Sequence, residues 1–199
     1  EAVIIASDVD AYDVASRFLA EFVELVAGMG EEREAVLADL AELDPVGLIR
    51  TKRRLGGRDA EAVSVIDAIQ QASLRRYQDP AWIAAAAAGL SDPSSAARSR
   101  AFDQLSRAGV HAIPAAVDIL NAPEPDNEPA RLGRALAWRL INELGSSARQ
   151  PLLTWLGSGD LARWPGIIRG LSACGSRSEV DFLLAPMLVI DSPPDVVQA

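Results

Sequence analysis

The chain has 199 residues, a net charge of −9 and only 5% aromatic residues. A single cysteine, Cys174, excludes an internal disulfide and cannot alone supply the clustered thiolates of a zinc or iron–sulfur site. No apolar run approaches the roughly 20 residues that cross a bilayer, and the negative charge disfavours a duplex-binding protein, which needs clustered positive charge. The sequence starts at Glu1 without a methionine, so a signal peptide or an upstream domain could precede it, and the compartment stays open.

The negative charge is concentrated at the N-terminus. Residues 1–45 contain twelve Asp and Glu against two Arg, whereas residues 46–199 contain sixteen acidic residues against seventeen basic ones. One basic run stands out, from Arg50 to Arg58. A phosphate or an acidic partner could bind this run, but we favour a solvated surface or contact with the acidic N-terminal helices.

Helical spacing of apolar residues, with abundant Ala and Leu and no alternating β-branched runs, predicts an all-α protein with essentially no sheet. In the N-terminal segment, residues 1–78, Gly, Asp and Asp-Pro mark the expected helix ends. The predicted helices of this segment cover residues 10–28, 31–43, 46–55 and 59–76.

From about Asp79 onward the helix-ending residues recur at a regular interval, which indicates an internal repeat. Residues 92–109 align with residues 128–145 at an offset of 36, and each copy closes with a glycine. A matching second helix follows each glycine, over residues 110–120 and 146–156.

Three further segments extend this pattern. Residues 79–90 are predicted to be the first helix of the pair that 93–108 completes. A degenerate third copy covers 158–175 and is followed by a helix over 179–190, and a fourth copy begins at Asp191. The chain then ends in mid-repeat, which is expected of one module of a larger protein.

The repeated features are an Asp-Pro that opens a helix, an Arg six positions after the Asp, apolar residues thereafter, and a Gly before the next Ala-x-Pro-type helix. This pattern resembles the HEAT repeat family, in the variant shared with the phycobilisome-lyase-like repeats. The resemblance covers residues 79–199 and implies an α/α superhelix, a solenoid of antiparallel helix pairs with which residues 1–78 are continuous. The third copy departs from the pattern, with Trp164 in place of the Arg and Pro165 beside it.

The resemblance also implies a ladder of polar pairs between adjacent repeats. In the family the recurring Asp and Arg typically pair, which assigns Arg98 and Arg134 to Asp92 and Glu128. This role is structural and not catalytic.

The helix over residues 128–144 carries the candidate binding surface. Its apolar stripe is Leu132, Gly133, Leu136, Ala137, Leu140 and Leu144. Trp138 falls about 150° from the centre of that stripe, beside Arg131, Arg134 and Asn142. Trp and Arg are enriched in interface hot spots, so these four residues are the predicted binding site. Alternatively, Trp138 fills the junction with the next repeat.

No catalytic, cofactor or metal site is expected. His111 lies at a turn between helices, and no Ser/His or Cys/His arrangement, phosphate-binding loop or HExxH motif is present. The sequence therefore predicts a non-catalytic scaffold whose partner is another protein or another domain of the same chain. Two enzyme classes remain as alternatives: a bilin lyase, suggested by the repeat subtype, and a DNA glycosylase using Trp155, Trp164 and Asp160.

Overall fold

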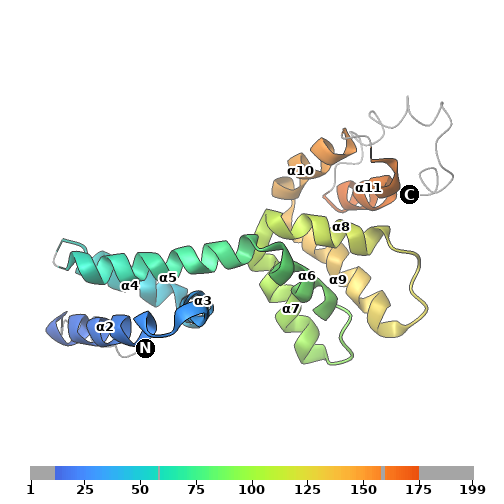
Figure 1. The fold of residues 1–199 in the computed structure, drawn as a ribbon. Coiled ribbons are helices and arrows are strands. Elements are labelled where there is room, and N and C mark those ends of the chain that lie inside the picture. The colour runs from blue at the N-terminus through green and yellow to red at the C-terminus, as the bar shows by residue number, and fades with distance from the viewer. Residues whose placement is uncertain (1–11, 58, 158–159, 175–199) are drawn as a thin grey trace. The chain divides into compact units, whose positions relative to one another are not determined.

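The computed structural model describes residues 12–57, 59–157 and 160–174 (Figure 1). Over these residues the protein is helical and contains no strand, which confirms the predicted all-α class. In the same residues no helix is both long and apolar enough to cross a membrane. The chain divides into two compact units, Glu1–Arg76 and Tyr77–Ala199. The predicted helix over 179–190 and the fourth repeat from Asp191 lie outside the described residues.

The first unit contains four α-helices in its described part: α2 (Tyr12–Ala27), α3 (Arg33–Leu43), α4 (Pro45–Leu55) and α5 (Ala60–Gln78), with a 3-10 turn at Gly30–Glu32. Two aspartates begin helices in the expected way. The side chain of Asp44 accepts from the N–H of Gly47 at 2.7 Å, and Asp59 accepts from the N–H of Ala62 at 2.9 Å. Each bond satisfies an N–H that has no partner within the helix.

Apolar residues of the first unit gather into two small clusters in its described part. One contains Val26, Leu37, Ala38, Ala41, Ile69 and Ala72, and the other Leu19, Leu55, Ala62 and Ile66. In the basic run, Lys52 pairs with Asp67 of α5 rather than with the acidic N-terminal helices, while Arg53 is exposed. The run therefore contributes at least one contact to the unit itself, and Arg58 lies outside the described residues.

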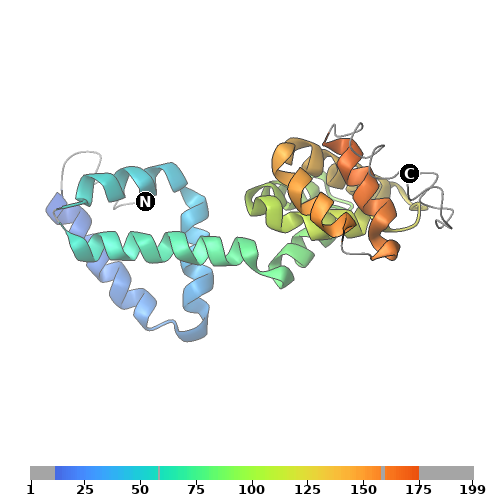
Figure 2. The same cartoon turned by 90° about the horizontal axis from the view of Figure 1, so that it is seen from above.

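The second unit contains six α-helices in its described part. They are α6 (Pro80–Gly89), α7 (Ser95–Ala108), α8 (Ile113–Asn121), α9 (Glu128–Leu144), α10 (Ser146–Leu156) and α11 (Trp164–Ala173), with 3-10 turns at Gly109–Ala112 and Leu161–Arg163. Helix α6 packs on α7, α8 on α9 and α10 on α11. We call these the three helix pairs; Figure 2 shows α10 and α11 side by side.

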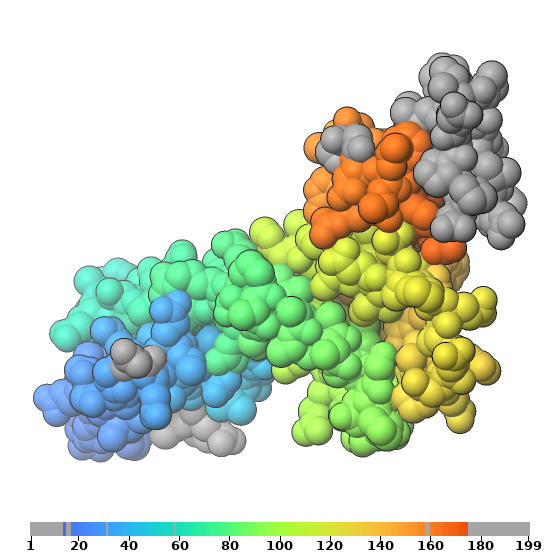
Figure 3. Space-filling view, turned by 45° about the vertical axis from the view of Figure 1, so that its right-hand side comes forward, coloured from blue at the N-terminus to red at the C-terminus, as the bar shows by residue number. Residues whose placement is uncertain are grey.

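Successive helix pairs contact each other in a repeated way. Helix α7 contacts α9, which contacts α11, and α6 contacts α8, which contacts α10. The most extensive contact joins α8 to α11, whose side chains meet in Figure 3. One core cluster therefore runs from Ile83 of α6 to Ala173 of α11. The predicted pairing of 79–90 with 93–108 matches α6 and α7, whereas α8 packs mainly on α9 and α11 and not on α7.

Two glycines form matching corners between the helix pairs. Gly109 has φ 58° and ψ −127°, and Gly145 has φ 51° and ψ −123°. These backbone conformations lie in a region that residues with a Cβ rarely adopt, so glycine is required at both corners. The offset of 36 predicted from the sequence therefore holds at the corners.

The predicted offset fails at the helix starts. Helix α7 begins after Ser94, whose side chain accepts from the N–H of Ala97, and α9 begins after Asn127, whose side chain accepts from the N–H of Ala130. These two caps are 33 residues apart. Helix α9 has 17 residues and α7 has 14, so α9 carries about one extra turn at its start.

Candidate protein-binding surface

Helix α9 buries most of the predicted apolar stripe, with Leu136 and Leu144 partly buried against the core, but the buried face also includes Ile141. Its buried residues are Gly133, Ala137, Leu140 and Ile141. Leu132, predicted to face the core, is 38% exposed, whereas Ile141 is fully buried. Because α9 packs on α7, α8 and α11 together, its buried face is turned toward Ile141.

Three of the four predicted binding residues line one hollow. Arg131, Arg134 and Trp138 of α9 surround a cavity of about 490 Å³. Its other lining residues are Leu120, Glu124, Pro125, Ala135, Arg169 and Ser172; we call this site the α9 hollow. Asn142, the fourth predicted residue, is exposed on the same face of α9, one turn beyond Trp138, and does not line it.

The indole of Trp138 lies at the surface of the α9 hollow. Its exposed fraction is 45%, and the ring belongs neither to the core cluster of this unit nor to the partly buried side chains packed against it. By contrast, Trp164 is 6% exposed and Trp155 is partly buried, and both pack in the core cluster. Trp138 is thus the most exposed of these three rings.

Arg134 holds the C-terminal end of α8. Its Nη2 donates to the carbonyl oxygen of Leu120 at 2.7 Å and its Nη1 to that of Pro123 at 3.5 Å. Arg169 of α11 donates to the same Leu120 oxygen at 2.8 Å. Carbonyl oxygens at a helix C-terminus carry partial negative charge, so two guanidinium groups are stabilised there.

Arg131 holds the loop that precedes α9. Its Nε donates to the carbonyl oxygen of Pro125 at 3.1 Å and its Nη2 to that of Asp126 at 3.4 Å. These acceptors are six and five residues before the arginine. Arg98 of α7 has the same pattern, because it donates to the carbonyl oxygens of Asp92 at 2.7 Å and Pro93 at 2.9 Å.

These contacts correct the predicted ladder. Arg98 and Arg134 bond to backbone carbonyl oxygens and not to the carboxylates of Asp92 and Glu128. The Asp92 carboxylate instead accepts from the N–H of Ser94 at 2.7 Å. Because the helix starts are 33 residues apart, the structural equivalent of Arg98 is Arg131.

Two arginines of the α9 hollow, Arg131 and Arg134, have no carboxylate partner among the described residues. Within the described residues, every bond of Arg131 and Arg134 goes to a neutral carbonyl oxygen, and no carboxylate lies within salt-bridge distance of either. Glu124 is the one acidic residue among those that line the hollow. Arg131 and Arg134 therefore bring two positive charges to the hollow beside this one lining carboxylate.

Sequence reasoning missed the contributions of α8, α11 and the loop between α8 and α9. Arg169, Ser172 and Glu124 lie far from Trp138 in the sequence and reach the α9 hollow through packing between helices. No spacing rule connects them to α9, so only the placement of α11 against α8 and α9 reveals them.

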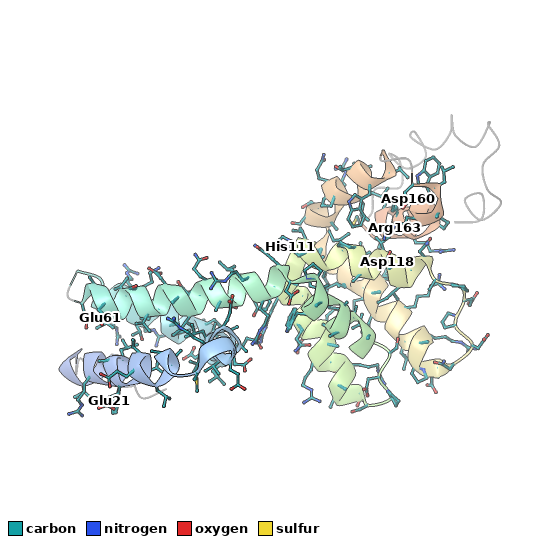
Figure 4. The ribbon with its side chains drawn as sticks, viewed as in Figure 1. Glu21, Glu61, His111, Asp118, Asp160 and Arg163 are labelled. Carbon is teal, nitrogen blue, oxygen red and sulfur yellow. The ribbon has the colours of Figure 1, made fainter. Side chains whose placement is uncertain are left out.

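The residues considered for enzyme chemistry lie at separate places in the second unit. The described residues contain no group of His, Cys, Asp and Glu arranged to hold a metal ion. His111 is exposed in a 3-10 turn. Asp160, a residue of the glycosylase alternative, has its Oδ2 3.7 Å from the Nε of Arg163. The same Nε lies 3.6 Å from the Oδ1 of Asp118 (Figure 4). These groups form a surface ion-pair cluster.

Cys174, at the end of α11, is half-buried. Its Sγ lies 3.9 Å from the carbonyl oxygen of Ile141. Burial raises the pKa of the thiol above its ordinary value, and the charge of Arg149 partly opposes that rise. A raised pKa makes the thiolate, the nucleophilic form of the side chain, scarcer at neutral pH.

Comparison of the chain with known protein families, with curated proteins and with solved structures finds no match.

Proposed function

We propose that the HEAT-like helical repeats predicted over residues 79–199 belong to a module that binds another protein, or another domain of the same chain, through the exposed face of α9. The repeated contacts between helix pairs support a superhelical stack, in which each pair needs its neighbours to bury its apolar side chains. The binding residues are Arg131, Arg134, Trp138 and Asn142.

The exposure of Trp138 carries this proposal. A tryptophan side chain has about 250 Å² of surface, so 45% exposure leaves roughly 110 Å² in water. At about 25 cal/mol per Å², covering that surface would contribute on the order of 2–3 kcal/mol to binding. Arginines beside a half-exposed tryptophan are the composition of an interface hot spot, and the hollow gives a partner side chain a place to insert.

The proposal is tested by site-specific photo-crosslinking in an extract of the source organism. A photoreactive amino acid replaces Ala135, which lines the α9 hollow, or Glu143, which is exposed on α9 but lies about 80° away around the helix. We expect a discrete crosslinked protein from position 135 only. Trp138→Ala should abolish that product while shifting the melting temperature by only a few degrees.

Two outcomes would contradict the proposal. Equal crosslinking from positions 135 and 143 would mean that the α9 face has no preferred partner. A collapse of the melting temperature in Trp138→Ala would mean that the ring supports the fold, as core truncations that cost about 3–5 kcal/mol do.

A further inference from the structure

The charges that line the α9 hollow identify the chemistry of its partner. Residues 77–174 contain nine acidic and nine basic residues, so this part of the chain has no net charge. Three of those nine basic residues, Arg131, Arg134 and Arg169, line the hollow, and Glu124 is the one acid among the described residues that line it. Arg131 and Arg134, which pair with no carboxylate in the described part of the chain, therefore concentrate positive charge on a neutral background.

Carbonyl oxygens hold Arg131 and Arg134 in place, and each side chain keeps unused N–H donors. A guanidinium group has five N–H donors. Within the described residues, Arg131 uses its Nε and Nη2 on carbonyl oxygens, and Arg134 uses Nη1 and Nη2. Each group therefore keeps N–H donors for a ligand. Its full charge also remains available, because a carbonyl oxygen orients a guanidinium group without neutralising it.

We propose that the α9 hollow binds an acidic peptide segment, in which two or more Asp or Glu carboxylates flank an aromatic or aliphatic side chain. This inference rests on the proposed function and adds the class of partner. Carboxylates match the planar, two-pronged donor geometry of Arg131 and Arg134. The apolar side chain between them covers Trp138.

The size of the charged site favours a peptide over a nucleic acid. Duplex DNA carries a charge about every 1.7 Å and its proteins typically make about 6–10 phosphate contacts along an extended basic track. The α9 hollow offers the guanidinium groups of Arg131 and Arg134 in one place on a chain with a net charge of −9. A segment with a few carboxylates is satisfied by that number of donors.

The test measures fluorescence anisotropy of labelled peptides on the full 199-residue chain. The first probe is a twelve-residue peptide in which pairs of Glu flank Leu and Phe, and the second has every Glu replaced by Gln. We expect the Glu peptide to bind at least tenfold more tightly than the Gln peptide. Its affinity should also fall as salt is raised from about 50 to 300 mM, because screening weakens exposed charges.

Variants locate the site on α9. Arg131→Gln should weaken binding of the Glu peptide about tenfold or more, as expected when a charge-assisted hydrogen bond is lost. Arg139→Gln is the matched control, because Arg139 lies on the same helix, pairs with Glu143 at 2.7 Å and does not line the α9 hollow. Binding by this control should stay within twofold of the unsubstituted protein.

Each contrary result has a distinct meaning. Equal weakening by Arg131→Gln and Arg139→Gln, or tighter binding of a twelve-nucleotide single strand than of the Glu peptide, would overturn the acidic-peptide proposal. Equal affinity for the Glu and Gln peptides, lost in Trp138→Ala, would overturn it and leave the proposed function standing. Failure of the crosslinking experiment at position 135, together with no peptide binding, would remove both.

Discussion

The helices of residues 12–76 and of residues 77–174 have similar lengths but bury their apolar side chains differently. In the second unit a single core cluster runs through all six described helices. In the described part of the first unit the buried residues form two small clusters. Large apolar side chains there also stay in water, with Leu43 77% exposed, Val46 62% and Ile49 59%. Repeated contact between helix pairs is what makes one core continuous.

Ion pairs take a larger part in the first unit. Arg76, whose side chain is 16% exposed, pairs with Asp39 and lies 3.5 Å from Glu42. Arg75 pairs with Glu34, and Lys52 with Asp67. These pairs link α5 to α3 and α4, where few apolar side chains are buried. Partly exposed ion pairs contribute little each, so we expect the first unit to be the less stable one.

Truncating one buried leucine in each unit gives the largest expected effect. Leu140 and Leu55 are both fully buried, but Leu140 lies in the continuous core and Leu55 in a small cluster. Leu140→Ala should cost about 4–5 kcal/mol and Leu55→Ala about 2–3 kcal/mol, because a small cluster collapses more easily around a cavity. Denaturant unfolding measures both, and equal costs would break the distinction between the two cores.

Gly166 lies where α11 packs against α8, and adding a methyl group there tests how tightly the continuous core is packed. A Cβ on Gly166 would lie 2.6 Å from the carbonyl oxygen of Val117 and 2.8 Å from the Cβ of Asn121. Gly166→Ala should therefore destabilise by about 1–3 kcal/mol. Gly157→Ala is the control, since its Cβ would meet nothing closer than 3.5 Å, and thermal melts should show it within about 0.5 kcal/mol of the parent.

Arg134→Ala tests the carbonyl contacts that replace the predicted ladder. The bond to Leu120 is partly buried, and its loss should cost about 1–2 kcal/mol. Arg100→Ala removes an exposed arginine from α7 and should cost under about 0.5 kcal/mol. Indistinguishable melting temperatures for the two variants would show that Arg134 does not help to hold α8.

Arg76→Met tests how much ion pairs stabilise the first unit. The substitution keeps much of the apolar stem and removes the ion pairs to Asp39 and Glu42, so it should cost about 1 kcal/mol at low salt. The cost should shrink in about 1 M salt, where the Debye length is roughly 3 Å. A cost that does not depend on salt would mean that packing, and not charge, explains the effect.

The smallest effect concerns the pH dependence at Cys174. Because burial raises the pKa of the thiol, the folded chain holds that proton more tightly than the unfolded chain. Stability from this group is therefore complete below the ordinary thiol pKa and is lost as pH rises through the raised value. Alkylation by iodoacetamide should accelerate at a higher pH in the folded protein than in urea, and coincident profiles would contradict this direction.

Local signals predicted much of the fold. Asp44 before Pro45 and Asp79 before Pro80 begin helices α4 and α6 as expected, because a side-chain acceptor and a fixed φ act over a few residues. The predicted apolar face of α9 was correct except at its edges, where Leu132 is exposed and Ile141 is buried, since the exact buried side depends on which helices surround it. The placement of Trp138 away from the core followed from helical rotation alone.

The features that sequence reasoning could not reach depend on contacts between distant segments. Helix α9 has about one extra turn at its start, which shifts the structural alignment of the two helices by three residues. The sequence alignment matched Arg98 with Arg134, whereas the helix start after Asn127 makes Arg131 the structural equivalent of Arg98. The presence of Arg169 in the α9 hollow depends on the packing of α11 against α8. Neither spacing nor composition carries that information.

The matching corners at Gly109 and Gly145 enclose one helix pair, α8 and α9, of the second unit. Both glycines turn the backbone through nearly the same dihedral angles, although a 3-10 turn follows Gly109 and helix α10 follows Gly145 directly. Joining Gly109 directly to Ser146 would delete the segment 110–145 and connect α7 to α10 through a single glycine corner. Such a deletion would remove the pair of helices α8 and α9 as a unit and leave one glycine of the required backbone conformation at the junction.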